Sequence, residues 1–69
     1  MLTTIKGSAV RGNARVVLEK EESPLVPEGS AYVTHVEVTD DRGTNKFWGH
    51  YGMTREAAEV DFQKRTASL

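Results

Sequence analysis

His35 and His50 are the residues of this chain whose type and spacing could bind a metal ion. They flank the turn-forming segment Asp40–Asn45, and pairing across that turn places the two imidazoles opposite each other. Directly opposed strand residues have Cβ atoms about 4.5–5.5 Å apart. The two histidines, with Glu37 nearby, could therefore coordinate Zn²⁺ or a similar ion. Structural zinc takes four protein ligands. We therefore favour ordinary strand histidines over a metal site or a pH-responsive patch, and predict no metal and no cofactor.

Trp48 is the residue best suited to recognition, since it lies between Lys46 and His50 in an aromatic segment. An exposed tryptophan can stack on a nucleobase or form the centre of a protein interface. Three acidic residues are expected on the same face and would repel phosphate: Glu19, Glu21 and Glu37. The formal net charge of -1 also argues against a polyanion binder. We predict a protein partner, with single-stranded nucleic acid as the alternative.

Catalytic motifs are not recognisable in the sequence. No serine sits in a nucleophile turn, and no glycine-rich loop could cradle a phosphate. A four-stranded sheet with one helix also offers little concavity for a substrate. We therefore predict a protein that is not an enzyme and has no catalytic residues. The acidic run formed by Glu19, Glu21, Glu22 and Glu28 is interpreted as a solvated strand edge.

Two hairpins are predicted to position these residues. Gly12-Asn13 between two valine-rich runs indicates a tight turn that pairs Lys6 with Glu19. The second hairpin joins residues 31–40 to 46–52 around Arg42-Gly43, which pairs Val38 with Phe47 and His35 with His50. Within the connecting segment of residues 23–30, Leu25 and Val26 are expected to tuck over one end of the core.

Alternation along the strands predicts one apolar face and one open face. The apolar face is expected to contain Ile5, Gly7, Val16, Leu18, Thr34, Val36, Val38, Phe47 and Tyr51. The open face would carry the partner-binding site, which we predict from Val17, Val33, His35, Glu37, Lys46, Trp48 and His50.

A C-terminal helix is predicted to cover the apolar face. Thr54 is a natural N-cap, and the helix has an acid near its start and bases near its end. Ala58, Phe62 and Leu69 share one stripe, whereas Val60 points away from it. The corner formed by residues 51–58 resembles the strand-to-helix corner of HicB-like antitoxins. Capping and close packing would give the same pattern in any such turn, so we infer no family membership from it.

The fold class that results is α+β, with the order β-β-β-β-α in one small domain spanning residues 1–69. With 69 residues and no cysteine, the domain has no disulfide to stabilise it. No apolar run is long enough to span a bilayer, so we expect a cytoplasmic protein without a membrane partner. Such a chain fits a small accessory or inhibitor protein, of the kind encoded by phages or mobile elements to inhibit host defence. A homodimer through a sheet edge or the open face is also expected.

Overall fold

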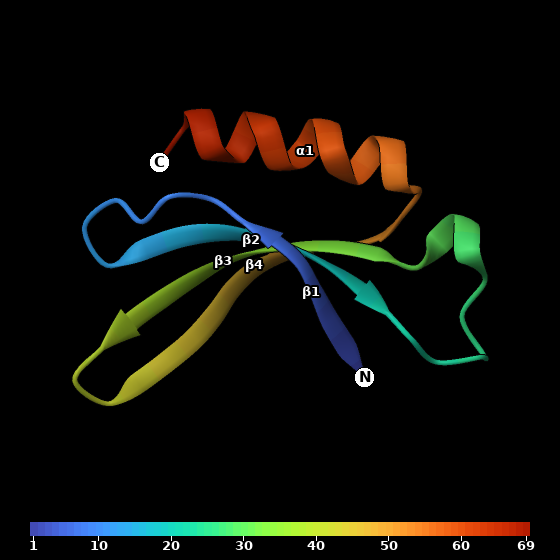
Figure 1. Ribbon diagram of the computed structural model, residues 1–69, viewed down its shortest axis with the longest axis horizontal. Coiled ribbons are helices and arrows are strands. Elements are labelled where there is room, and N and C mark those ends of the chain that lie inside the picture. Colours follow the sequence, from blue (N-terminus) through green and yellow to red (C-terminus); the bar gives the residue numbers. More distant parts are fainter.

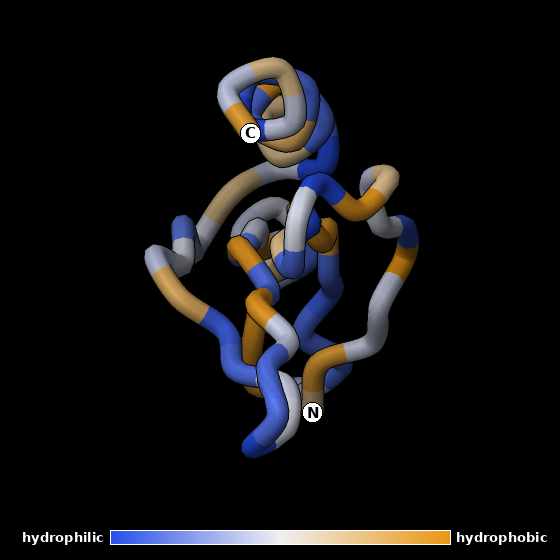
Figure 2. The backbone as a smooth tube through the Cα atoms, turned by 90° about the vertical axis from the view of Figure 1, so that its left-hand side faces the viewer, coloured by the Kyte–Doolittle hydropathy of each residue, from blue (hydrophilic) through white to orange (hydrophobic).

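The chain folds into a four-stranded antiparallel sheet with one helix on one face, which confirms the predicted fold class (Figure 1). The computed structural model describes residues 1–69. The elements are β1 (Leu2–Gly7), β2 (Ala14–Glu21), the short 3-10 helix η1 (Glu28–Ser30), β3 (Tyr32–Asp40), β4 (Gly43–Met53) and α1 (Arg55–Ala67). The strands follow the order β1-β2-β3-β4, so β1 and β4 are the sheet edges. Turned by 90°, α1 lies above the sheet as a separate layer (Figure 2).

The helix α1 begins at the predicted cap. The Thr54 hydroxyl accepts a hydrogen bond from the Ala57 amide at 3.1 Å, which satisfies one free N–H group of the first turn. Glu56 lies in the first turn, and Lys64 and Arg65 lie in the last, where each complements the helix dipole. No helix of the chain is long and apolar enough to cross a membrane.

The apolar core lies between α1 and the sheet. Its buried members are Val16, Leu18, Ala31, Tyr32, Ala58 and Phe62, with Ile5, Val26, Met53 and Leu69 packed against them. Phe62 is buried as predicted, but it clusters with side chains of β2 rather than with Phe47, which is 45% exposed. The loop prediction is correct for Val26 and wrong for Leu25, which points into solvent.

The first hairpin has the predicted turn but not the predicted register. Arg11 and Ala14 exchange backbone hydrogen bonds of 2.8 and 3.1 Å around Gly12-Asn13. Further along, Gly7 pairs with Val17 and Lys6 with Leu18, one residue away from the expected register, and a bulge interrupts β1 between Thr4 and Lys6. Lys6 pairs with Leu18 and therefore faces α1, so the predicted Lys6–Glu19 pair is wrong. Lys6 bonds instead to Glu59 at 2.6 Å.

The second hairpin turns at Asp41-Arg42, so its pairing is displaced by two residues from the predicted one. Val36 pairs with Phe47, and Thr34 pairs with His50. The ladder slips between these two pairs because β4 holds one extra residue there, and Trp48 in this bulge has a φ of 50°. A bulge reverses the side of the residues that follow it, here as far as the second register shift, between the Thr34 and Tyr32 pairs. His50 therefore faces α1 and Tyr51 faces away, the opposite of the predicted arrangement.

The sheet side that faces away from α1, called the far face below, is buried at its centre. Val17, Glu19, Val33 and His35 are each no more than 5% exposed, so the predicted open face is wrong. Leu2 of β1 and Tyr51 of β4 line the same cavity on this side. The two edge strands thus converge over the far face and cover it without a second helix.

Candidate functional site

The structure divides the seven residues predicted to form one binding surface. Val17, Val33 and His35 are buried in the far face, where Glu37 and Lys46 also lie. Trp48 and His50 lie on the helix side, because of the β4 bulge. The apolar strip expected to support a face-to-face homodimer does not form, since two of its three residues are buried within the monomer.

A groove beside Trp48 lies on the helix side. Trp48 is 70% exposed, as predicted, and lies near Phe47 with 5.6 Å between the ring centroids. The groove measures about 390 Å³. Its lining consists of Ala14, Val36, Trp48, Lys64, Arg65, Ser68 and Leu69. An aromatic side chain thus stands beside an apolar floor with a basic rim at the end of α1.

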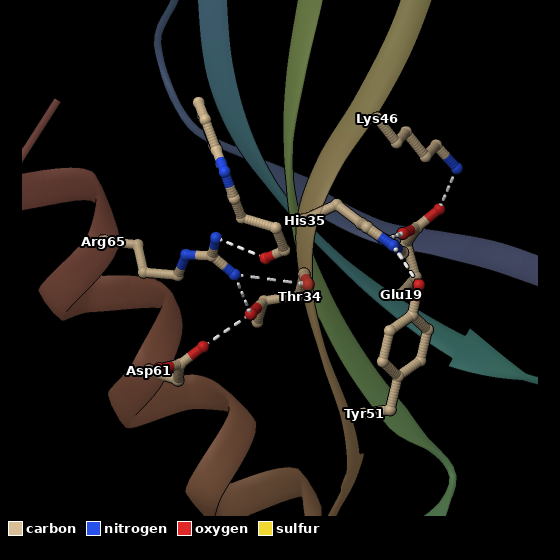
Figure 3. A network of polar contacts seen from close by, with 8 residues as sticks. Glu19, Thr34, His35, Lys46, Tyr51, Asp61 and Arg65 are labelled. Atoms are coloured by element: carbon tan, nitrogen blue, oxygen red, sulfur yellow. Dashed lines mark hydrogen bonds and ion pairs between the residues drawn. The ribbon is translucent and has the colours of Figure 1, made fainter.

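The backbone at Trp48 is held in an unfavourable conformation by a specific contact. Trp48 is the only non-glycine residue with a positive φ, and the left-handed region costs about 1–2 kcal/mol for a residue with a Cβ. Its carbonyl oxygen accepts a hydrogen bond from Arg65 of α1. The same guanidinium donates to the Thr34 hydroxyl at 3.0 Å, so Arg65 ties the helix to both β3 and β4 (Figure 3).

His50 pairs with Asp61 of α1 beside this contact. The His50 Nδ1 atom lies 2.8 Å from Asp61 Oδ2, which also accepts a hydrogen bond from the Thr34 hydroxyl. Partial burial raises the pKa of Asp61, but the hydrogen bonds from Thr34 and His50 and the charge of Arg65 outweigh it, so the pKa lies below its ordinary value. His50, which was expected on the open face, is therefore a hydrogen-bonding partner of the helix.

A second polar cluster, the Glu19–His35–Tyr51 chain, lies on the far face (Figure 3). Glu19 Oε1 lies 2.7 Å from His35 Nδ1, and His35 Nε2 lies 2.8 Å from the Tyr51 hydroxyl. Lys46 donates to the other carboxylate oxygen of Glu19. The buried carboxylate and imidazole thus lead to a tyrosine that is 66% exposed.

Gly49 makes the close approach of His35 and Tyr51 possible. A Cβ atom at this position would lie 2.6 Å from His35 Nε2 and 2.5 Å from a ring carbon of Tyr51. A glycine inside a strand often marks a bulge or such a close approach. This glycine was the one signal in the sequence that could have indicated the cluster, because Glu19, His35 and Tyr51 come from three different strands.

The two histidines lie on opposite sides of the sheet. His35 contacts Glu19 and Tyr51, whereas His50 contacts Asp61 of the helix. The predicted pairing of their imidazoles is therefore wrong, and with it the geometry of a two-histidine metal site. No group of three or more histidine, aspartate or glutamate side chains is arranged to hold a metal ion.

The acidic run predicted to be a solvated edge is paired with basic groups. Glu19 is buried in the far face, and Glu21 bonds to the terminal ammonium of Met1. Glu28 accepts hydrogen bonds from Lys20 and from the Tyr32 hydroxyl, and these bonds lower its pKa. Three of the four acids thus have partners within the domain.

Comparison with known proteins gives no relative for this chain. No family model matches it, and no curated protein or solved structure shows significant similarity. The groove and the two polar clusters are therefore the features that bear on function.

Proposed function

We propose that this protein is a non-enzymatic binding module, an accessory or inhibitor protein that occupies a partner's surface with the groove beside Trp48. The observation that carries the proposal is Trp48 itself, which is largely exposed although its backbone is held in a costly conformation. Because the ring is largely exposed, its burial within the monomer does not offset the conformational free energy of the backbone. Exposed tryptophans beside apolar clefts are typical centres of protein interfaces.

The lining of the groove indicates the chemistry of the partner. Its floor is apolar at Val36 and Leu69, and Lys64 stands at its rim. A partner that inserts an apolar side chain into the groove and places a carboxylate of its own next to Lys64 would match both features. A protein acting in this way needs no chemistry of its own, which fits inhibitors of host defence encoded by phages or mobile elements.

Affinity capture from a lysate of the source organism tests the proposal, with wild type, Trp48→Ala and Val60→Ala as baits. Val60 is exposed on α1 outside the groove lining, so it provides a matched control. We expect a protein that wild type and Val60→Ala retain equally, and that Trp48→Ala binds about 2 kcal/mol more weakly. Equal retention by all three baits would contradict the proposal.

Tryptophan fluorescence gives a direct second measurement, because the chain contains one tryptophan. Titration of wild type with the captured protein should shift the emission to shorter wavelength as Trp48 leaves water. An unshifted emission at saturation would place the contact elsewhere on the molecule.

Single-stranded nucleic acid is a second candidate ligand, and one observation favours it. The acids expected to repel phosphate do not share a surface with Trp48: Glu19 is buried, and Glu37 pairs with Arg15 on the far face. Base stacking on Trp48 with phosphate contacts from Lys64 would give affinity that falls steeply with salt. Anisotropy of a labelled oligothymidylate at rising salt tests this candidate, and Lys64→Ala should reduce the salt dependence. Absence of binding at low salt would exclude it.

Self-association through a sheet edge is the remaining part of the proposal. β1 and β4 are both interrupted by bulges, which leaves Gly43–Phe47 of β4 as a regular free edge. A homodimer would pair these segments. Sedimentation at tens of micromolar tests the pairing, and a single species of about 7.6 kDa without concentration dependence would contradict it.

A further inference from the structure

We infer that the Tyr51 hydroxyl is an activated nucleophile that takes up an acyl group from activated esters of short aliphatic acids. The Glu19–His35–Tyr51 chain has the geometry that such activation needs. The nucleophile lies within hydrogen-bond distance of a base, at 2.8 Å, and a third group orients that base at 2.7 Å. This site lies on the far face, away from the groove that contains Trp48.

The direction of the hydrogen bonds follows from the partners. A carboxylate only accepts, so the His35 Nδ1 atom carries the proton that Glu19 binds. In a neutral imidazole the Nε2 atom then has a free lone pair, and Tyr51 donates its hydroxyl proton to it. Lys46 lies on the other carboxylate oxygen of Glu19. Glu19 acts as a positioning residue and His35 as the base.

The surroundings of Tyr51 indicate the substrate class. Tyr51 is one of the residues that line a cavity of about 240 Å³, whose walls are mainly apolar at Leu2, Val26 and Val33 and also include Glu21. A short aliphatic chain fits such walls better than a charged or strongly polar group. Tyr51 is 66% exposed and His35 is 5% exposed, so Tyr51 is the member of the chain that solvent reaches.

The transfer is balanced without a further reactant. The Tyr51 oxygen attacks the acyl carbon of p-nitrophenyl butyrate, an oxygen–carbon bond forms, and the ester bond to p-nitrophenolate breaks. The phenol proton moves to His35 Nε2 and then to solvent. The product is a butyryl ester of Tyr51, and no atom changes its oxidation state.

Gly49→Ala is the decisive variant, because it keeps all three side chains of the chain. The added Cβ would meet both His35 and Tyr51 below 3 Å, so it forces the base and the nucleophile apart. Gly29→Ala is the matched control, since a Cβ there meets nothing within 4 Å and its φ is not positive. Circular dichroism shows whether both variants keep the wild-type fold.

The experiment treats the full chain with p-nitrophenyl butyrate at neutral pH and locates the label by peptide mass spectrometry. Hydroxylamine removes a tyrosine ester but not a lysine amide, which separates Tyr51 from the amines. We expect wild type and Gly29→Ala to acylate Tyr51 at least tenfold faster than N-acetyltyrosinamide reacts. Gly49→Ala should react at the rate of the model compound. Equal rates in wild type and Gly49→Ala, or an unlabelled Tyr51, would overturn the inference.

The pH profile of wild type gives a test that needs no variant. Glu19 from β2 and Tyr51 from β4 face the His35 imidazole, and Lys46 lies behind Glu19. The Arg15–Glu37 pair and the pair of Glu21 with the terminal ammonium of Met1 are the other ion pairs on this face. With His35 taking up the phenol proton, the rate should rise less steeply with pH than the rate of free tyrosine. A rate that rises about tenfold per pH unit, as for free tyrosine, would contradict a role for His35.

Discussion

The two faces of β2 and β3 are both buried, but by different kinds of side chains. On the helix side, Val16 and Leu18 pack under α1 in an apolar cluster. On the far face, Val17 and Glu19 of the same strand are equally inaccessible, and Glu19 is held by hydrogen bonds to His35 and Lys46. A sheet face without a helix can therefore be closed by its own edge strands when their polar side chains find polar partners.

This difference has an energetic consequence. Apolar packing is non-directional and scales with the area buried, so the helix side loses stability in proportion to the atoms removed. The far face depends on matched donors and acceptors, so the loss of one group leaves another unpaired. A polar replacement of similar shape should therefore restore stability on the far face, where hydrogen bonds are lost, and not on the helix side, where packing is lost.

The largest effect is expected from Phe62→Ala on the helix side. Removing this buried ring should cost about 3–5 kcal/mol. A 69-residue domain has a free energy of unfolding of about 3–10 kcal/mol, so the variant should lose a large part of its stability. Thermal and urea unfolding followed by circular dichroism measures the loss. A cooperative transition close to that of wild type would refute the packing described for α1.

Glu19→Ala should have the next largest effect, on the far face. The substitution leaves His35 without the acceptor for its Nδ1 proton, which should cost about 2–3 kcal/mol. Glu19→Gln keeps an acceptor oxygen and should recover about half of that loss. Urea unfolding compares the two variants. Equal stability of alanine and glutamine at this position would mean that packing, rather than hydrogen bonding, closes the far face.

The bulge at Trp48 determines which face each of the next β4 side chains lies on. A pair of glycine substitutions tests the backbone strain at Trp48. Both substitutions remove an aromatic ring and add flexibility, but only Trp48→Gly relieves a left-handed residue. The two variants should differ by about 1–2 kcal/mol in the free energy of unfolding, with Trp48→Gly the more stable. Urea unfolding measures both. A Trp48→Gly variant less stable than Phe47→Gly would show that the indole contributes to folding, and would weaken its role in binding.

The smallest effect concerns pH and the Asp61 carboxylate on the helix side. Its pKa is lowered in the folded state, so its contribution to stability is present above the ordinary value and is lost as pH falls through the folded pKa. Wild type should exceed Asp61→Asn by about 0.5–1 kcal/mol at pH 6, and this difference should vanish at strongly acid pH. Urea unfolding from pH 6 to pH 2 measures it. A difference that grows toward acid pH would contradict the pairing with His50.

The parts of the fold that could be predicted from sequence are those set by neighbouring residues. Gly12-Asn13 indicated its turn, Thr54 indicated the start of α1, and the spacing of Ala58 and Phe62 indicated the buried stripe. Each signal acts within a few residues, so the chain itself contains the necessary information.

The candidate sites could be predicted only in part, because they depend on bulges. Nothing in the residue type of Trp48 indicates a positive φ, yet this single residue exchanges the sides of His50 and Tyr51. The burial of His35 depends on strands that are distant in the sequence. Exposure of Trp48 was predicted correctly, but from a face assignment that was wrong.

Arg65 links the end of the helix thermodynamically to the binding surface. Its guanidinium holds the carbonyl of Trp48 and the hydroxyl of Thr34 from the last turn of α1. Helix ends are the first segments to open in native proteins. When this turn frays, the groove loses both the Arg65 contact and its wall at Leu69. A ligand in the groove must therefore shift the opening equilibrium of the C-terminal turn toward the closed state. By reciprocity, a change that loosens this turn weakens the binding of the ligand by the same free energy.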